Sequence, residues 1–160
     1  MADDEQARDA LTDLEGRWEG RGEGYYPTIA PFSYREQLTF TRLAGKPVVE
    51  YRQRTWDERS GQPMHAEVGY LRAVSDREVE LVLAQPTGVA EVASGLVVAD
   101  GWVELRGTAH PTPTAKRVDE VVRRLRREGD VLVTELSMSA MGQPLTGHLR
   151  SHLDRADPAE

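Results

Sequence analysis

The 160-residue sequence contains no cysteine, only two phenylalanines and only four histidines. Without cysteine the chain has no disulfides, zinc–thiolate sites, iron–sulfur clusters, thiolate-ligated haem or cysteine nucleophile. No apolar run is long enough to span a bilayer, and the first residues, MADDEQARDA, show neither the basic nor the apolar region of a secretory signal. These absences predict a protein of a reducing compartment, expected to be the cytoplasm, with no membrane partner.

Basic residues are outnumbered by acidic ones, 20 to 27, so the net charge at pH 7 is -7. An acidic chain is repelled by the phosphate backbone, so we expect no nucleic-acid partner. The local exception is the basic run Arg123-Arg124-Leu125-Arg126-Arg127. We interpret this run as the solvated face and turn of a strand.

Alternation of apolar and polar residues dominates the chain after a short helix, which we predict from Asp3 to Leu14. A period of two indicates β-strands. We therefore divide the chain into a helical segment (1–15), a β-domain (16–155) and a C-terminal tail (156–160). The predicted strands are Gly16–Tyr26, Phe32–Leu43, Pro47–Trp56, Met64–Ala73, Val79–Gln85, Val89–Val98, Trp102–Ala109, Ala115–Arg126, Val131–Ala140 and Leu145–Asp154.

The connections between these strands are short and rich in Gly, Pro and Asp, which is typical of turns. Connections of this length cannot contain crossover helices, so consecutive strands should be antiparallel neighbours. About ten such strands predict an all-β protein, an antiparallel up-and-down β-barrel with room inside for one ligand. A β-sandwich is the alternative. Two proline-stiffened segments, Tyr26–Pro31 and His110–Thr114, are predicted loops at the rim of the mouth.

The motif Gly16-Arg17-Trp18-Glu19-Gly20-Arg21-Gly22 reads G-x-W-x-G-x-G. It is not a dinucleotide-binding fingerprint, because no strand precedes it and no βαβ unit follows. Glycine at alternate positions of a first strand allows a sharp bend at a barrel corner. We interpret the motif as structural, with Trp18 filling the closed end of the barrel.

The histidines are the candidate metal ligands, and two of them, His148 and His152, lie near the C-terminus after a Met-rich segment. No HExxH pattern or third ligand accompanies them, which disfavours a zinc site made by protein alone. Plain alternation places His148 opposite the neighbouring leucines, facing water. A β-bulge after Pro144, or leucines that pack outward, would turn it inward. By pattern alone, His65 is a surface or turn residue and His110 is a loop residue.

Several stretches, in order from residue 16 to about 153, resemble nitrobindin, a family of haem-binding β-barrels with a lipocalin-like shape. The similarity covers nearly the whole β-domain. The stretches are GRWEGRGEGYYPTIAPFSYRE, GKPVVEYRQRTWD, GQPMHAEVGYLR, VELVLAQPTGVAEVASG, TAKRVDE and MSAMGQPLTGHL.

This resemblance implies a ten-stranded barrel that holds one haem b per chain in an apolar pocket near an open end. His148 matches the histidine that ligates the iron, and so is the implied metal ligand and catalytic residue. His152 lies outside the matched motif and is expected at the surface. The implied haem-binding positions are Thr28, Met64, His65, Gln85, Lys116, Met138 and His148.

The resemblance also implies an activity, the isomerisation of peroxynitrite to nitrate at the ferric haem, with nitric oxide binding at the same iron. One axial imidazole leaves the sixth position of the iron open to such ligands. A haem or nitric oxide sensor, or a carrier of a small apolar ligand, is the alternative without turnover. The expected partners are therefore small molecules. For the oligomeric state, a homodimer is a possibility that the sequence leaves undecided.

Overall fold

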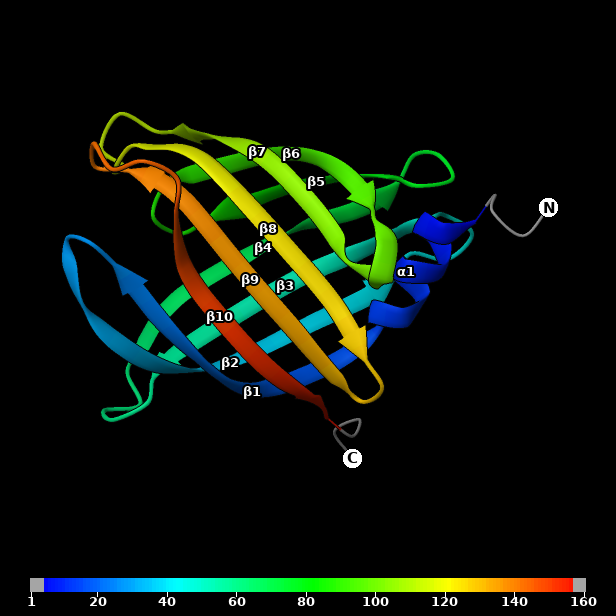
Figure 1. Cartoon of the computed structure of the whole chain (residues 1–160), viewed down its shortest axis with the longest axis horizontal. Helices are drawn as coiled ribbons and strands as arrows, with labels where there is room; N and C mark the ends of the chain where they lie inside the picture. The colour runs from blue at the N-terminus through cyan, green and yellow to red at the C-terminus, as the bar shows by residue number, and fades with distance from the viewer. Residues whose placement is uncertain (1–4, 157–160) are drawn as a thin grey trace.

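The computed structural model describes residues 5–156, in which ten antiparallel strands close into a barrel. The strands follow chain order, and β1 pairs with β10 to complete the circle (Figure 1). Closure removes the free sheet edges wherever β1 and β10 pair. The predicted up-and-down barrel is confirmed and the sandwich alternative is wrong. The strands are β1 Gly16–Tyr26, β2 Ile29–Arg42, β3 Val48–Asp57, β4 Pro63–Ala73, β5 Glu78–Gln85, β6 Val89–Val97, β7 Val103–Pro111, β8 Val118–Glu128, β9 Val131–Ala140 and β10 Thr146–Arg155.

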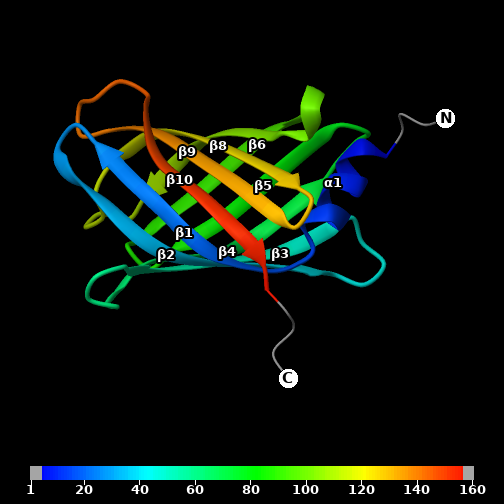
Figure 2. The same cartoon turned by 60° about the horizontal axis from the view of Figure 1, so that its bottom comes forward.

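Helix α1 (Gln6–Leu14) lies across one end of the barrel (Figures 1 and 2). It begins later than predicted, and Asp3 and Asp4 of the predicted helix lie outside the described residues. Its apolar face reaches Trp18, which is fully buried and donates from Nε1 to the carbonyl oxygen of Leu14 at 2.8 Å. The helix and Trp18 together fill this end, in agreement with the structural interpretation of the glycine motif. No helix in residues 5–156 is long and apolar enough to cross a membrane.

The opposite end of the barrel carries the turns β1–β2, β3–β4, β5–β6, β7–β8 and β9–β10 (Figure 1). The predicted loop Tyr26–Pro31 is wrong: only Pro27 and Thr28 form the turn, and Tyr26 pairs with Ile29. The second predicted rim loop begins as strand, since β7 continues to Pro111. Strand β8 begins at Val118, three residues after its predicted start, because the preceding residues belong to the β7–β8 connection.

Strands β1 and β10 stop pairing with each other near this end. Their pairing runs from Trp18↔Arg155 to Gly24↔Leu149 and stops there. The last part of β1 continues with β2 alone, while the first part of β10 continues with β9 (Figure 1). This separation positions the candidate site described next.

Candidate functional site

A cavity of about 240 Å³ lies inside the barrel toward the end opposite α1. Five of the seven residues implied by the resemblance line it together, and they come from the four strands β4, β5, β9 and β10. Apolar side chains of β2, β6, β8, β9 and β10 complete its walls. The five predicted residues are Met64, His65, Gln85, Met138 and His148.

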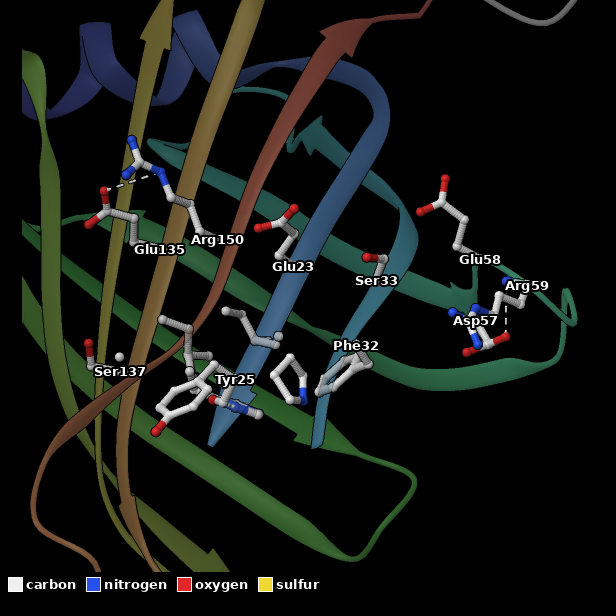
Figure 3. A pocket seen from close by; sticks show the side chains of 16 residues that line it. Glu23, Tyr25, Phe32, Ser33, Asp57, Glu58, Arg59, Glu135, Ser137 and Arg150 are labelled. Carbon is white, nitrogen blue, oxygen red and sulfur yellow. Dashed lines mark hydrogen bonds and ion pairs between the residues drawn. The ribbon is translucent and has the colours of Figure 1, made fainter. Parts of the chain in front are cut away.

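A second, wider depression of about 1010 Å³ lies where β1 and β10 separate. Phe32, Leu136, His148 and Leu149 line both spaces, so the depression and the inner cavity meet at these side chains. Charged groups surround the depression. Glu135 and Arg150 lie on one side of Tyr25 and Phe32, and Asp57, Glu58 and Arg59 lie on the other (Figure 3). The site is therefore apolar inside and ionic at its mouth.

A β-bulge turns His148 toward this site. Gly147 pairs with Ser137 and Leu149 pairs with the adjacent Leu136, so His148 is an extra residue in β10. From the C-terminal side of the bulge, Leu153, Ser151 and Leu149 alternate inward, and without the bulge His148 would face outward. Because of the bulge, His148 and Leu149 both line the cavity. The β-bulge that the inward orientation of His148 requires thus exists, and its extra residue lies four residues after Pro144.

The imidazole of His148 is fixed by the backbone of β1. Its Nδ1 lies 2.8 Å from the carbonyl oxygen of Tyr25. A carbonyl oxygen can only accept, so Nδ1 carries the proton and the lone pair of the neutral ring is on Nε2. Burial lowers the pKa of His148, although the hydrogen bond to Tyr25 acts in the opposite direction. The ring is held in the neutral form and tautomer that binds a metal through Nε2.

Two aromatic rings flank His148. Tyr26 meets it edge-on with ring centroids 5.4 Å apart, and Phe32 does so at 6.3 Å. The Tyr26 hydroxyl lies 3.0 Å from the carbonyl oxygen of Ala140 and accepts the Ala140 N–H at 2.9 Å, which ties the end of β1 to β9. These contacts restrict rotation of the imidazole and keep the separated strands at a fixed distance.

The floor of the cavity is ionic. Arg123 of β8 donates to both carboxylate oxygens of Glu67 at 2.8 and 2.9 Å, and to those of Glu91 at 2.7 and 2.9 Å. All three side chains are buried. Burial alone would raise the pKa of Glu67, but the Arg123 guanidinium and a hydrogen bond from His65 hold it well below its usual range. Glu67 is therefore an anion within the barrel at neutral pH.

Below this floor a second polar cluster contains a carboxyl group that has no cation in contact. Glu36 accepts hydrogen bonds from Ser151 and, at 3.1 Å, from Gln53 Nε2. Tyr34 hydroxyl lies 2.8 Å from the Ser151 hydroxyl. None of the ion pairs among residues 5–156 includes Glu36. Burial raises its pKa, and the hydrogen bonds from Ser151 and Gln53 offset this only partly.

Two of the residues implied by the resemblance lie elsewhere. Thr28 is in the two-residue β1–β2 turn and Lys116 is in the β7–β8 connection, both exposed, and neither lines the inner cavity. Their contact with a haem stays a prediction. His152 is exposed, as expected. His110 is also exposed, but its interpretation as a loop residue is wrong, because it lies within β7.

The sequence did not predict the ionic floor of the cavity, and the interpretation of the basic run as a solvated face is wrong for Arg123. Arg123 was assigned to a solvated face, yet it is an interior residue with two buried carboxylate partners. The signal was present: Arg123 alternates with the buried Val121 and Leu125, so it occupies an inward position of β8. Glu67 and Glu91 likewise stand in inward positions of their strands.

The donor set and shape of the site fit a haem. Among the described residues, no three His, Cys, Asp or Glu side chains gather to hold a bare metal ion. A single imidazole with a free Nε2 suits a metal whose other ligands come from a macrocycle. The inner cavity alone is below the roughly 300–1,000 Å³ of common ligand sites, and its junction with the depression provides the remaining space.

The fold and the site define a class, a closed β-barrel that encloses a small ligand near one end. The family described as "THAP4-like, heme-binding beta-barrel domain" matches residues 7–155. The chain belongs to this family, which confirms the resemblance to haem-binding barrels. It is 45% identical over 150 residues to a protein named peroxynitrite isomerase 2 from Mycobacterium avium, covering 91% of this chain and 92% of that one.

Other relatives agree with this assignment. A protein named peroxynitrite isomerase from Nocardia farcinica is 46% identical over 152 residues, covering 91% of this chain and 89% of the relative. The crystal structure of Rv2717c from M. tuberculosis superposes with a TM-score of 0.89 at 43% identity, covering 94% of this chain and 98% of that one. An S-type phycobiliprotein lyase from Guillardia theta shares the fold alone, with a TM-score of 0.64 and 13% identity.

Proposed function

We propose that this protein binds one haem b through Nε2 of His148, isomerises peroxynitrite to nitrate at the ferric iron and binds nitric oxide there. The observation that carries the proposal is the hydrogen bond from His148 Nδ1–H to the carbonyl oxygen of Tyr25, which presents Nε2 at the cavity wall. Two relatives that match over nine-tenths of this chain, from Mycobacterium avium and Nocardia farcinica, carry the name peroxynitrite isomerase. Because the chain has no cysteine, the proposal includes the reducing cytoplasm as its location.

The residues of this chain have separate roles in the proposed reaction. His148 holds the cofactor, and Tyr25, Tyr26 and Phe32 keep its ring in place. A bound ferric haem supplies an open coordination position at which an anionic oxidant is activated. The walls formed by Leu136 and Leu149 are apolar. A small enclosed space also favours recombination of the two fragments of the oxidant before either escapes.

The test compares haem-loaded and haem-free protein in the decay of peroxynitrite. We expect decay to accelerate in proportion to haem content, with more nitrate relative to nitrite and less nitration of an added phenol. Cyanide should abolish the acceleration because it occupies the open position on the iron. The haem-free protein controls for direct reaction of the oxidant with tryptophan, tyrosine and methionine side chains of the chain.

Equal protection by the loaded and haem-free proteins would contradict the enzymatic proposal. Binding of haem and nitric oxide without accelerated decay would leave the sensor or carrier alternative. Size-exclusion chromatography with light scattering at several concentrations tests the homodimer.

A further inference from the structure

Glu67 is the most heavily bonded side chain near the cavity. Its Oε1 atom lies 2.8 Å from Arg123 Nη2 and 3.1 Å from Gln85 Nε2. Its Oε2 atom accepts from the other terminal nitrogen of Arg123 and from the Tyr51 hydroxyl, each at 2.9 Å. Only 3% of the Glu67 side chain is exposed. With this set of donors and one ion-pair partner, Glu67 is an acceptor with a fixed orientation.

The fourth partner of Glu67 is His65, two residues earlier on the inner face of β4. His65 Nε2 lies 3.1 Å from Glu67 Oε1. Because the ionised carboxylate can only accept, His65 must donate from Nε2. The backbone N–H of His65 is held as well, by Thr55 Oγ1 at 3.1 Å. Both the ring orientation and the tautomer of His65 therefore follow from its neighbours.

This arrangement gives the two histidines of the cavity opposite tautomers. His148 donates from Nδ1 and leaves Nε2 free, whereas His65 donates from Nε2 and leaves Nδ1 free. Among residues 5–156, nothing forms a hydrogen bond with His65 Nδ1. Since the His65 ring lines the cavity and is about one-third exposed, Nδ1 is the nitrogen that a ligand in the cavity can reach.

We propose that Glu67 is a positioning residue: anchored by Arg123, it holds His65 with Nδ1 free to exchange a hydrogen bond with a small anionic ligand in the cavity. An imidazole nitrogen without a proton can accept a hydrogen bond, and the same nitrogen with a proton can donate one. It can therefore bond both to an anion and to the protonated form of that anion. The ligand part of this inference rests on the proposed function, because the anion would be held by the haem iron. The tautomer of His65 does not depend on haem.

The matched control for Glu67 is Glu91. It is equally buried and bonded to the same guanidinium through two hydrogen bonds, but it does not contact His65. Glu67→Gln and Glu91→Gln therefore remove the same charge from the same partner. Only Glu67→Gln removes the anionic acceptor of the His65 N–H.

The first measurement is imidazole nitrogen NMR on haem-free protein. In the wild type, His65 should show one tautomer with the proton on Nε2, and Glu91→Gln should preserve it. Glu67→Gln should give a mixture of tautomers, because a glutamine amide can donate as well as accept. A wild-type His65 protonated on Nδ1 alone would overturn the proposal without any variant, even if Glu67→Gln does not fold. A tautomer mixture in Glu91→Gln equal to that in Glu67→Gln would also overturn it.

The second measurement is cyanide affinity of the ferric, haem-loaded protein. Loss of one hydrogen bond corresponds to about a 2- to 10-fold weaker affinity. We expect this loss in His65→Leu and in Glu67→Gln alike, and less than twofold change in Glu91→Gln. Unchanged affinity in His65→Leu and Glu67→Gln would refute the ligand contact. Failure of the wild type to bind haem would instead refute the proposed function, and the NMR result would still decide the positioning role of Glu67.

Discussion

Arg123 offers a quantitative test of the ionic floor of the cavity. Its guanidinium makes four hydrogen bonds of 2.7 to 2.9 Å to two buried carboxylates. Arg123→Met keeps the apolar stem of the side chain but leaves Glu67 and Glu91 without their cation. Breaking a buried ion pair from one side costs about 3–5 kcal/mol. For a chain of this length that corresponds to a fall in Tm of about 6–20 °C.

The matched control is Arg124→Met on the same strand. Arg124 pairs with Glu104 at 3.0 Å and Glu135 at 3.2 Å, but these side chains are about one-third exposed. Exposed pairs of this kind contribute about 0–1 kcal/mol each. Urea unfolding of both variants gives the difference in unfolding free energy directly. Equal losses for Arg123→Met and Arg124→Met would refute the assignment of a buried ionic cluster.

The pH dependence of this difference has a definite sign. In the wild type, the pKa of Glu67 is depressed by Arg123 despite burial, so its stabilising effect is present above the pKa of the unfolded chain and is lost as pH falls. Without Arg123, burial favours the protonated carboxyl group of Glu67. The penalty of Arg123→Met should therefore shrink between pH 7 and pH 4. A penalty that stays constant over this range would contradict the electrostatic explanation.

Two further predictions concern Glu36 and Gly24. The pKa of Glu36 is raised by burial, so its stabilising effect is full below the pKa of the unfolded chain and is lost as pH rises. In urea unfolding, Glu36→Gln should therefore become more stable relative to wild type between pH 4.5 and pH 8. A difference in unfolding free energy that does not change over this range would argue against a buried acid. A Cβ on Gly24 would clash with the ring of Phe32. Gly24→Ala should therefore displace Phe32 and weaken haem binding, and a haem titration with wild-type affinity would contradict this.

The barrel could be predicted from the sequence because its signal is local. Alternation along each strand and Gly, Pro or Asp in each connection identify antiparallel neighbours without knowledge of distant contacts. Strands β1 (Gly16–Tyr26) and β9 (Val131–Ala140) have the predicted bounds, and most other strand ends differ by one to three residues. Turn lengths were harder, because the strand pair Tyr26↔Ile29 shortens a segment that its prolines suggested to be a loop.

The site could be predicted only through the family resemblance. Alternation alone assigns His148 to the outside, because the bulge that turns it inward depends on how β10 pairs with β9. The role of Arg123 depends on partners 56 and 32 residues away in sequence, Glu67 and Glu91. A charged residue in an inward position of a strand was the available clue, and it becomes interpretable only when the opposite strands are placed.

The most direct test of the haem site is a titration of the haem-free protein with haem, followed by the Soret absorption band. The wild type and His152→Ala should bind one haem per chain with the same spectrum, because His152 is exposed and outside the cavity. His148→Ala should lose the band or bind far more weakly, because His148 presents the free Nε2 at the cavity wall. A normal spectrum for His148→Ala, or loss of binding in His152→Ala, would contradict the assignment of His148 as the iron ligand.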